Sequence, residues 1–203
     1  MAAESVVLAP APAFAVNEGA RPQSAIFAGG CFWGIEGVFS HVKGVTSVVS
    51  GYEGGGRADA SYDRVSTGDT GHAEAVRVTY DPAQVSYGQL LRIFFSAGAD
   101  PTQRDRQGPD TGTQYRSALV PLTPEQRSVA TAYLAQLSKS GLWKQPIVTR
   151  IEPARGFYPA EDHHQDFMAL NPHHPYIERW DQPKVAALAR LFPASYKPDF
   201  TRN

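Results

Sequence analysis

Residues 24–42 read SAIFAGGCFWGIEGVFSHV, and this stretch decides the fold because it holds a strand, a turn and a helix in succession. The apolar run at residues 25–28 predicts a strand, and the two glycines at 29–30 predict a tight turn. Apolar residues then recur at three- and four-residue spacing from position 35 to 42. This spacing is typical of one face of a helix, here over residues 32–42.

Cys31, the only cysteine of the chain, comes immediately after the glycine turn. A helix N-terminus presents unpaired backbone N–H groups and the positive end of the helix dipole, and both stabilise a thiolate. We therefore expect the pKa of the Cys31 thiol to be lowered and its sulfur to be nucleophilic at neutral pH. The adjacent Phe32 and Trp33 predict an apolar pocket around it. Alternatively, Cys31 is simply a small buried apolar side chain.

Periodicity and turn signals predict further strands and helices along the chain. Strands are expected at residues 45–51, 72–80, 116–122 and 147–152, helices after the caps Ser86 and Thr123, polar loops at 52–71 and 100–113, and short helices near 161–168 and 184–191. The order is β-α-β-β-α-β with an added helix and strand and an irregular C-terminal segment. This order predicts an α+β fold, a two-layer sandwich with a ferredoxin-like core.

The length of 203 residues fits one domain, which we place at residues 24–203. The Ala- and Pro-rich residues 1–23 predict a flexible N-terminal extension or an extended arm. They lack the basic region of an intact signal peptide. The compartment is therefore left open between the cytoplasm and export, with a slight preference for export.

The charge and cysteine content exclude several classes of protein. A net charge of −1 without a basic cluster argues against nucleic acid as a partner. No apolar run is long enough to span a bilayer, so no membrane partner is expected. A single cysteine excludes an internal disulfide framework and a multi-thiolate zinc site. We expect a monomer.

Acidic and phenolic side chains near Cys31 would be needed if a thiolate displaced an oxygen. Glu74 lies in an alternating strand on the same side as His72 and Val76, so its carboxyl can be buried, and burial would keep it protonated near neutral pH. Tyr62 and Tyr115 lie in polar loops, where a phenol can donate a hydrogen bond into a pocket. The alternative for Glu74 is a solvent-facing position.

The pairs His163-His164 and His173-His174, with Glu161 and Asp162 nearby, raise the possibility of a metal site. Adjacent histidines on one helix point to different faces, and no His-Glu-x-x-His spacing occurs. Packing and hydrogen bonding within the C-terminal segment are the favoured roles, and no bound metal or cofactor is expected.

Five motifs, in order, resemble those of the A-type peptide methionine sulfoxide reductases. They are GCFWG at 30–34, VSGYEGG at 49–55, GDTGHAE at 68–74, GTQYRS at 112–117 and AEDHHQ at 160–165. The resemblance extends over most of the chain, from about residue 24 to 175. It implies a mixed α/β fold with a ferredoxin-like core and reduction of the S epimer of methionine sulfoxide, free or in proteins.

The resemblance also assigns roles to individual residues. It implies that Cys31 is the nucleophile, that Glu74 is the acid near the sulfoxide oxygen, and that Tyr62 and Tyr115 hydrogen-bond this oxygen. It further implies that Phe32 and Trp33 hold the substrate's methyl group, with the Asp110 carboxylate supporting the site. Attack on the sulfoxide would leave Cys31 as a sulfenic acid.

Many relatives carry further cysteines near the C-terminus that resolve the sulfenic acid, whereas this chain has none. We therefore expect a one-cysteine enzyme whose resolving thiol comes from outside, from a thioredoxin- or glutaredoxin-type protein or from glutathione. Two other classes remain open. A cysteine hydrolase would form an acyl-enzyme on Cys31, and a non-catalytic sulfoxide- or peptide-binding module would have an unreactive thiol.

Overall fold

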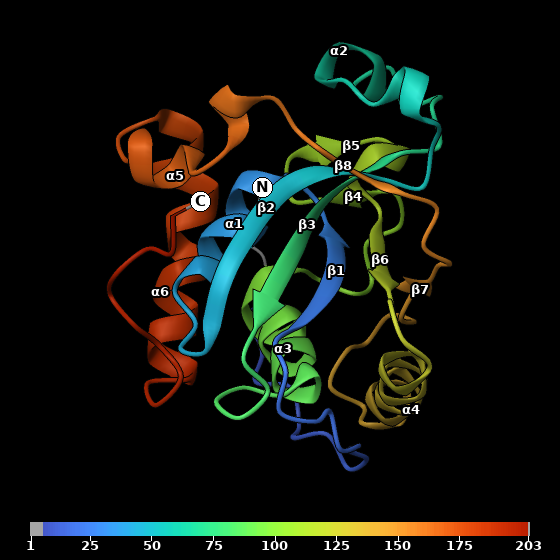
Figure 1. Cartoon of the computed structure of the whole chain (residues 1–203), viewed down its shortest axis with the longest axis vertical. Coiled ribbons are helices and arrows are strands. Elements are labelled where there is room, and N and C mark those ends of the chain that lie inside the picture. The colour runs from blue at the N-terminus through green and yellow to red at the C-terminus, as the bar shows by residue number, and fades with distance from the viewer. Residues whose placement is uncertain (1–5, 203) are drawn as a thin grey trace.

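The computed structural model describes residues 6–202 and is built around a six-stranded sheet (Figure 1). The strands follow the order β7-β6-β1-β3-β2-β8, with bounds β1 (Gln23–Gly29), β2 (Val45–Glu53), β3 (Ala73–Tyr80), β6 (Ser117–Val120), β7 (Arg150–Ile151) and β8 (Phe157–Pro159). Strands β6 and β7 run parallel, and the other neighbours pair antiparallel.

The four central strands confirm the predicted ferredoxin-like core. Strand β3 lies between β1 and β2, and β6 lies on the other side of β1. This is the arrangement expected when two β-α-β units interleave. The added strand β7 is shorter than the predicted 147–152, and β8, which pairs with the end of β2, was not predicted.

Four longer helices accompany the sheet: α1 (Phe32–Ser40), α3 (Tyr87–Ile93), α4 (Pro124–Lys139) and α6 (Gln182–Leu191). The predicted caps are present. The Ser86 hydroxyl accepts from the Gln89 backbone N–H in a capping box, and the Thr123 hydroxyl accepts from the Gln126 backbone N–H. These bonds satisfy N–H groups that a helix start leaves unpaired, which fixes where α3 and α4 begin.

The two polar loops contain short elements of their own. Residues 52–71 hold η1 (Arg57–Asp59) and α2 (Tyr62–Val65), and residues 100–113 hold the hairpin β4 (Arg106–Gln107) and β5 (Asp110–Thr111), followed by η3 (Thr113–Tyr115).

The C-terminal segment contains η4 (Asp162–His164), α5 (Phe167–Leu170) and the π-helical turn η5 (Ile177–Asp181). A second π-helical turn, η2 (Phe94–Gly98), extends α3.

The main core lies between the sheet and its helices. The Phe27 ring of β1 lies with its centroid 4.7 Å from that of Phe39 on α1 and 5.4 Å from that of Phe94 after α3. Burial of each such ring stabilises the fold by about 2–3 kcal/mol. Alternation along β3 turns Val76 and Val78 toward the same core. Glu74, two residues earlier, therefore points to the helix-bearing face of the sheet.

Residues 6–22 form an extended arm against α3 and α4, which begins near the middle of Figure 1 and continues to the bottom of the view. Ala9 is fully buried, and its backbone N–H donates to the Ser96 hydroxyl. The Tyr133 hydroxyl donates to the Pro10 carbonyl, and the Glu18 carboxylate accepts from the Tyr80 hydroxyl. The predicted boundary between an N-terminal extension and the domain, at residue 23, stays a prediction. The predicted flexibility of this extension includes residues 1–5, which are outside the described part of the chain. Among residues 6–202, none of the helices has both the length and the apolar character to cross a bilayer.

Candidate active site

Cys31 is the N-cap residue of α1, directly above the end of β1. Gly30 holds the turn with a φ of +93°, and a Cβ at this position would lie 2.5 Å from the Gln107 Cβ. Glycine is therefore required both for the backbone conformation and for the close approach of the β4 hairpin. Gln107 is itself fixed, because its side chain accepts from the Asp100 N–H and donates to the Asp100 carbonyl. The turn sequence thus places the sulfur against a rigid wall.

The pKa of the Cys31 thiol is raised rather than lowered, so the expectation based on the helix N-terminus is wrong. Burial is the largest cause, and the nearby carboxyl groups of Glu74, Asp181 and Asp110 add to it. The backbone N–H of Trp33 does donate to the sulfur, as the helix position predicts, but it is outweighed. The resting thiol is therefore protonated at neutral pH.

Glu74 lies beneath the start of α1 and is 3% exposed. Its Oε2 accepts from the backbone N–H of Phe32 at 3.0 Å, so the carboxyl is bound to the residue that directly follows Cys31. Burial raises the pKa of Glu74 to about 8, and the charges of Asp110 and Asp181 add to this increase. The hydrogen bond from the Phe32 N–H acts in the opposite direction and lowers the pKa. The burial expected from strand alternation is found, and the group holds a proton at neutral pH.

The aromatic residues beside Cys31 contact the C-terminal segment. Phe32 is buried with its ring centroid 5.3 Å from that of His164. The Trp33 ring stacks on Phe167 at 3.8 Å, and its Nε1–H donates to His164 Nδ1. Burial lowers the pKa of His164, which keeps this acceptor nitrogen unprotonated. The rings of Phe32 and Trp33 thus form one wall with His164 and Phe167, which lie more than a hundred positions later in the chain.

Tyr62, Tyr115 and Asp110 come from three separate loop elements, α2, η3 and β5. The pKa of each phenol is raised, mainly by burial and next by the Glu74 carboxyl. The pKa of Asp110 is also raised by burial, against a hydrogen bond from Tyr176. The structure therefore gathers the predicted residues around Glu74, with both phenols protonated and able to donate.

Tyr176 is a residue of this site that the sequence analysis did not identify. With Asp110, Gln107 and Lys184 it lines a small cavity that contains Cys31, and its hydroxyl donates to Asp110 Oδ2. Burial raises the pKa of its phenol, and the nearby Cys31 adds to the shift. Tyr176 lies in a Pro- and His-rich segment without periodicity, so its position gave no sequence signal.

Asp181 was missed for the same reason. It is fully buried at the start of α6, and a Cβ on Gly34 would lie 2.3 Å from its Oδ1. Its carboxyl acts on the pKa of both Cys31 and Glu74. Gly34, inside the first motif, is thus required for the close approach of α6 to α1.

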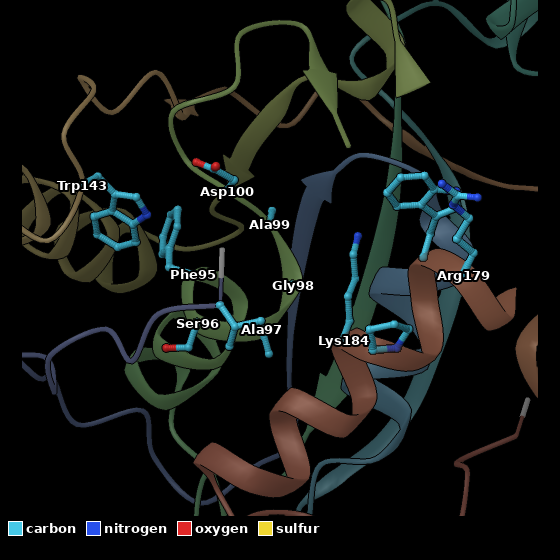
Figure 2. Close-up of a pocket in the computed structure, with 12 residues that line it drawn as sticks. Phe95, Ser96, Ala97, Gly98, Ala99, Asp100, Trp143, Arg179 and Lys184 are labelled. Atoms are coloured by element: carbon cyan, nitrogen blue, oxygen red, sulfur yellow. The ribbon is translucent and has the colours of Figure 1, made fainter. Parts of the chain in front are cut away.

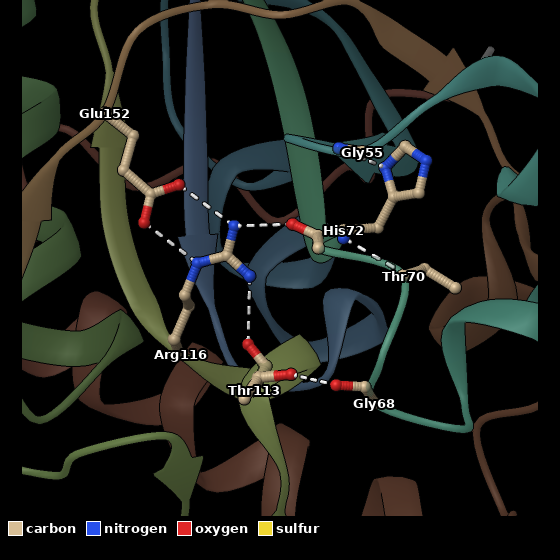
Figure 3. A network of polar contacts seen from close by, with 8 residues as sticks. Gly55, Gly68, Thr70, His72, Thr113, Arg116 and Glu152 are labelled. Atoms are coloured by element: carbon tan, nitrogen blue, oxygen red, sulfur yellow. Dashed lines mark hydrogen bonds and ion pairs between the residues drawn. The ribbon is translucent and has the colours of Figure 1, made fainter.

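Arg116 ties together the loops that carry the site, as Figure 3 shows. Its guanidinium donates to both carboxylate oxygens of Glu152 at 2.9 Å, and to the carbonyls of Thr113 and Gly71 at 3.0 Å. Arg116 directly follows Tyr115, and Gly71 is three residues before Glu74. A bidentate pair of this kind fixes geometry as well as contributing energy.

We expect Arg116→Met to lower the free energy of unfolding by about 2–4 kcal/mol, because it leaves the Glu152 carboxylate and two carbonyls without their donor. Denaturant unfolding measures this change. Arg116→Lys is the control, since it keeps the charge but loses the fork geometry, and it should lose less than half as much. Equal stability of Arg116→Met and the unmodified protein would contradict this account of the network.

Within the described part of the chain, no group of three or more His, Cys, Asp or Glu side chains gathers to hold a metal ion. His164 is engaged with the aromatic wall, and His173 pairs with Glu178 at an exposed position. His174 also makes contacts within the C-terminal segment, since its Nδ1 accepts from the Tyr176 backbone N–H and its ring lies against that of Trp33.

Comparison with known proteins points to one family. The profile described as "Peptide methionine sulfoxide reductase" matches residues 23–194. The chain is 56% identical to the peptide methionine sulfoxide reductase MsrA 2 of Mesorhizobium japonicum, over 89% of this chain and 94% of that protein. It is 52% identical to the peptide methionine sulfoxide reductase MsrA of Deinococcus radiodurans, over 86% of this chain and 84% of that protein.

Solved structures of methionine sulfoxide reductases are also similar to this chain. The methionine sulfoxide reductase A of Corynebacterium diphtheriae is similar with a TM-score of 0.64 and 35% identity, over 79% of this chain and 81% of that one. The reduced form of Mxr1 from Saccharomyces cerevisiae gives a TM-score of 0.64 and 32% identity, over 76% of this chain and 88% of that one.

Proposed function

The chain belongs to the peptide methionine sulfoxide reductase family, and from this membership we propose a role for each residue around Cys31. The protein reduces the S epimer of methionine sulfoxide to methionine at the expense of a thiol, and so repairs oxidised proteins. The comparisons do not favour a cysteine hydrolase or a non-catalytic binding module.

Cys31 is the nucleophile and Glu74 the proton donor. One observation carries this proposal: the Glu74 carboxyl is held by the N–H of Phe32, the residue next to Cys31, and its pKa is about 8. A carboxylic acid beside a sulfur can deliver a proton to the oxygen bound to the sulfur under attack. Tyr62 and Tyr115 remain protonated and donate hydrogen bonds to the same oxygen.

The reaction balances without any further group. The Cys31 sulfur attacks the sulfoxide sulfur while Glu74 gives its proton to the oxygen, and the thiol proton of Cys31 restores the acid. The S–O bond then breaks and the hydroxyl bonds to the Cys31 sulfur as a sulfenic acid, while the S–S bond formed in the attack breaks and leaves its electron pair on the methionine sulfur. Phe32 and Trp33 hold the methyl group of the substrate. Asp110 supports the polar side of the site, where its carboxylate accepts a hydrogen bond from the Tyr176 hydroxyl.

The resolving thiol comes from outside the chain, because Cys31 is the only cysteine and cannot form an intramolecular disulfide. A thioredoxin- or glutaredoxin-type protein or glutathione attacks the sulfenic sulfur, releases water and leaves a mixed disulfide, which a second thiol reduces. The enzyme acts as a monomer, with no second copy needed to supply this thiol.

After one turnover without reductant, we expect one equivalent of methionine and one added oxygen on Cys31, and in a parallel sample a 1,3-dione should convert this sulfenic acid into a stable thioether adduct. Mass spectrometry of the enzyme and product measures both. A dithiol added to a sample that contains no dione should return Cys31 to the free thiol and restore turnover. Methionine formed in more than one equivalent without a thiol would contradict the external-reductant mechanism.

A further inference from the structure

An apolar groove lies next to the cavity at Cys31 (Figure 2). Its walls come from four distant parts of the chain: Val6 of the arm, Phe95 of η2, Trp143 after α4 and Trp180 of η5. Val6 is 40% exposed, and both indole rings are only partly buried. A surface that exposes Val6 and parts of two indoles, with the buried Phe95 also at its wall, is suited to covering another apolar side chain.

The groove adjoins the cavity that Cys31 lines. Trp180 and Lys184 line both of them. The groove also includes Asp100, which is hydrogen-bonded to the Gln107 side chain at the wall of the cavity. A chain that leaves the Cys31 cavity on this side passes directly over the groove.

Two cations lie on the rim. Lys184 and Arg179 line the groove, and the Arg179 guanidinium lies 5.1 Å from the Trp180 ring centroid. Asp100 is the acidic residue opposite them, as Figure 2 shows. The rim therefore carries charges of both signs beside its apolar wall.

We propose that this groove binds the residue flanking the oxidised methionine in a protein substrate and favours a large apolar side chain there. The inference rests on the proposed function, since it needs methionine sulfoxide at Cys31. Successive residues of an extended chain are about 3.3 Å apart, and the side chains that follow the oxidised methionine would pass Trp180 and Lys184, which line both the cavity and the groove. Free methionine sulfoxide does not extend there, so the groove discriminates among protein sites without acting on the chemistry.

Two capped pentapeptides test the proposal, with the oxidised methionine flanked on both sides by leucine or by serine. We expect kcat/KM to be about ten-fold higher for the leucine peptide, the effect of partly burying one such side chain. Trp143→Ala should reduce the ratio to less than two-fold while leaving turnover of N-acetylmethionine sulfoxide unchanged. Trp143→Phe is the matched control and should keep most of the preference.

Val6→Asp is a second variant that does not depend on the packing of an indole, because Val6 is at an exposed edge. A carboxylate there should lower the leucine-peptide kcat/KM and leave the free sulfoxide unaffected. If both variants kept the preference for the leucine peptide, the proposed role of the groove would be wrong. A ratio of kcat/KM for the two peptides near one in the unmodified protein would also contradict it. Failure of the wild type to reduce N-acetylmethionine sulfoxide would instead overturn the proposed function itself.

Discussion

Cys31→Ser is expected to abolish methionine sulfoxide reduction, with kcat/KM lowered by at least about 10⁴-fold. A hydroxyl at this position is far less nucleophilic and cannot accept the oxygen as a sulfenic acid. Because Cys31 is the only cysteine, no other thiol of the chain can substitute for it. Turnover with a dithiol reductant and N-acetylmethionine sulfoxide gives the comparison.

The variant should remain folded, since serine is nearly isosteric and the N-cap position of α1 favours it. An unchanged melting temperature and retained binding of the sulfoxide would separate lost chemistry from lost structure. If Cys31→Ser kept more than about a hundredth of the wild-type rate, the nucleophile would have to be another group, and the assignment of Cys31 would be wrong.

Glu74→Gln is expected to lower kcat by about 10²- to 10⁴-fold while changing KM little. Glutamine keeps the shape and still accepts from the Phe32 N–H, so the turn at Cys31 is preserved. It has no acidic proton to give to the leaving oxygen. Steady-state kinetics with N-acetylmethionine sulfoxide measure the split between kcat and KM.

The pH profile separates a proton donor from a residue that only positions others. Glu74 acts in its protonated form, and its pKa is about 8, so its contribution is present below that pH and is lost as the pH rises through it. The wild-type kcat/KM, which reports the ionisation of the free enzyme, should therefore fall above about pH 8, and Glu74→Gln should lose this fall. An unchanged fall in the variant would contradict the acid role.

Glu36→Gln is the matched control, because Glu36 is also fully buried and burial raises its pKa to about 8. It lies on α1, where its Oε1 accepts from the Asp166 N–H, away from the groups that surround the sulfur. Replacing this carboxyl by an amide should leave kcat/KM and its fall above about pH 8 unchanged. A loss equal to that of Glu74→Gln would mean that any buried carboxyl near α1 affects the rate.

The ferredoxin-like core was predictable because its signals are local. Alternation placed the strands, the caps Ser86 and Thr123 fixed the helix starts, and the position of Glu74 in its strand indicated the buried face. Strand β8 was not predictable, since it is three residues long and forms only by pairing with the end of β2. The boundary of β7 was overestimated for a similar reason.

Two features of the site depend on contacts between distant segments. Tyr176 and Asp181 reach Cys31 only through the path of the C-terminal segment over α1, which no sequence period encodes. The same segment explains the incorrect expectation for the thiol. A helix N-terminus lowers a thiol pKa locally, but desolvation and carboxyl groups from three other elements raise the pKa of Cys31.

Single turnover with sulfoxide carrying an ¹⁸O label, made separately as the S and R epimers, tests the central claim most directly. The account predicts one equivalent of methionine from the S epimer, none from the R epimer, and the label on the peptide that contains Cys31. Release of the label to water with Cys31 unmodified, or equal reduction of the two epimers, would contradict it.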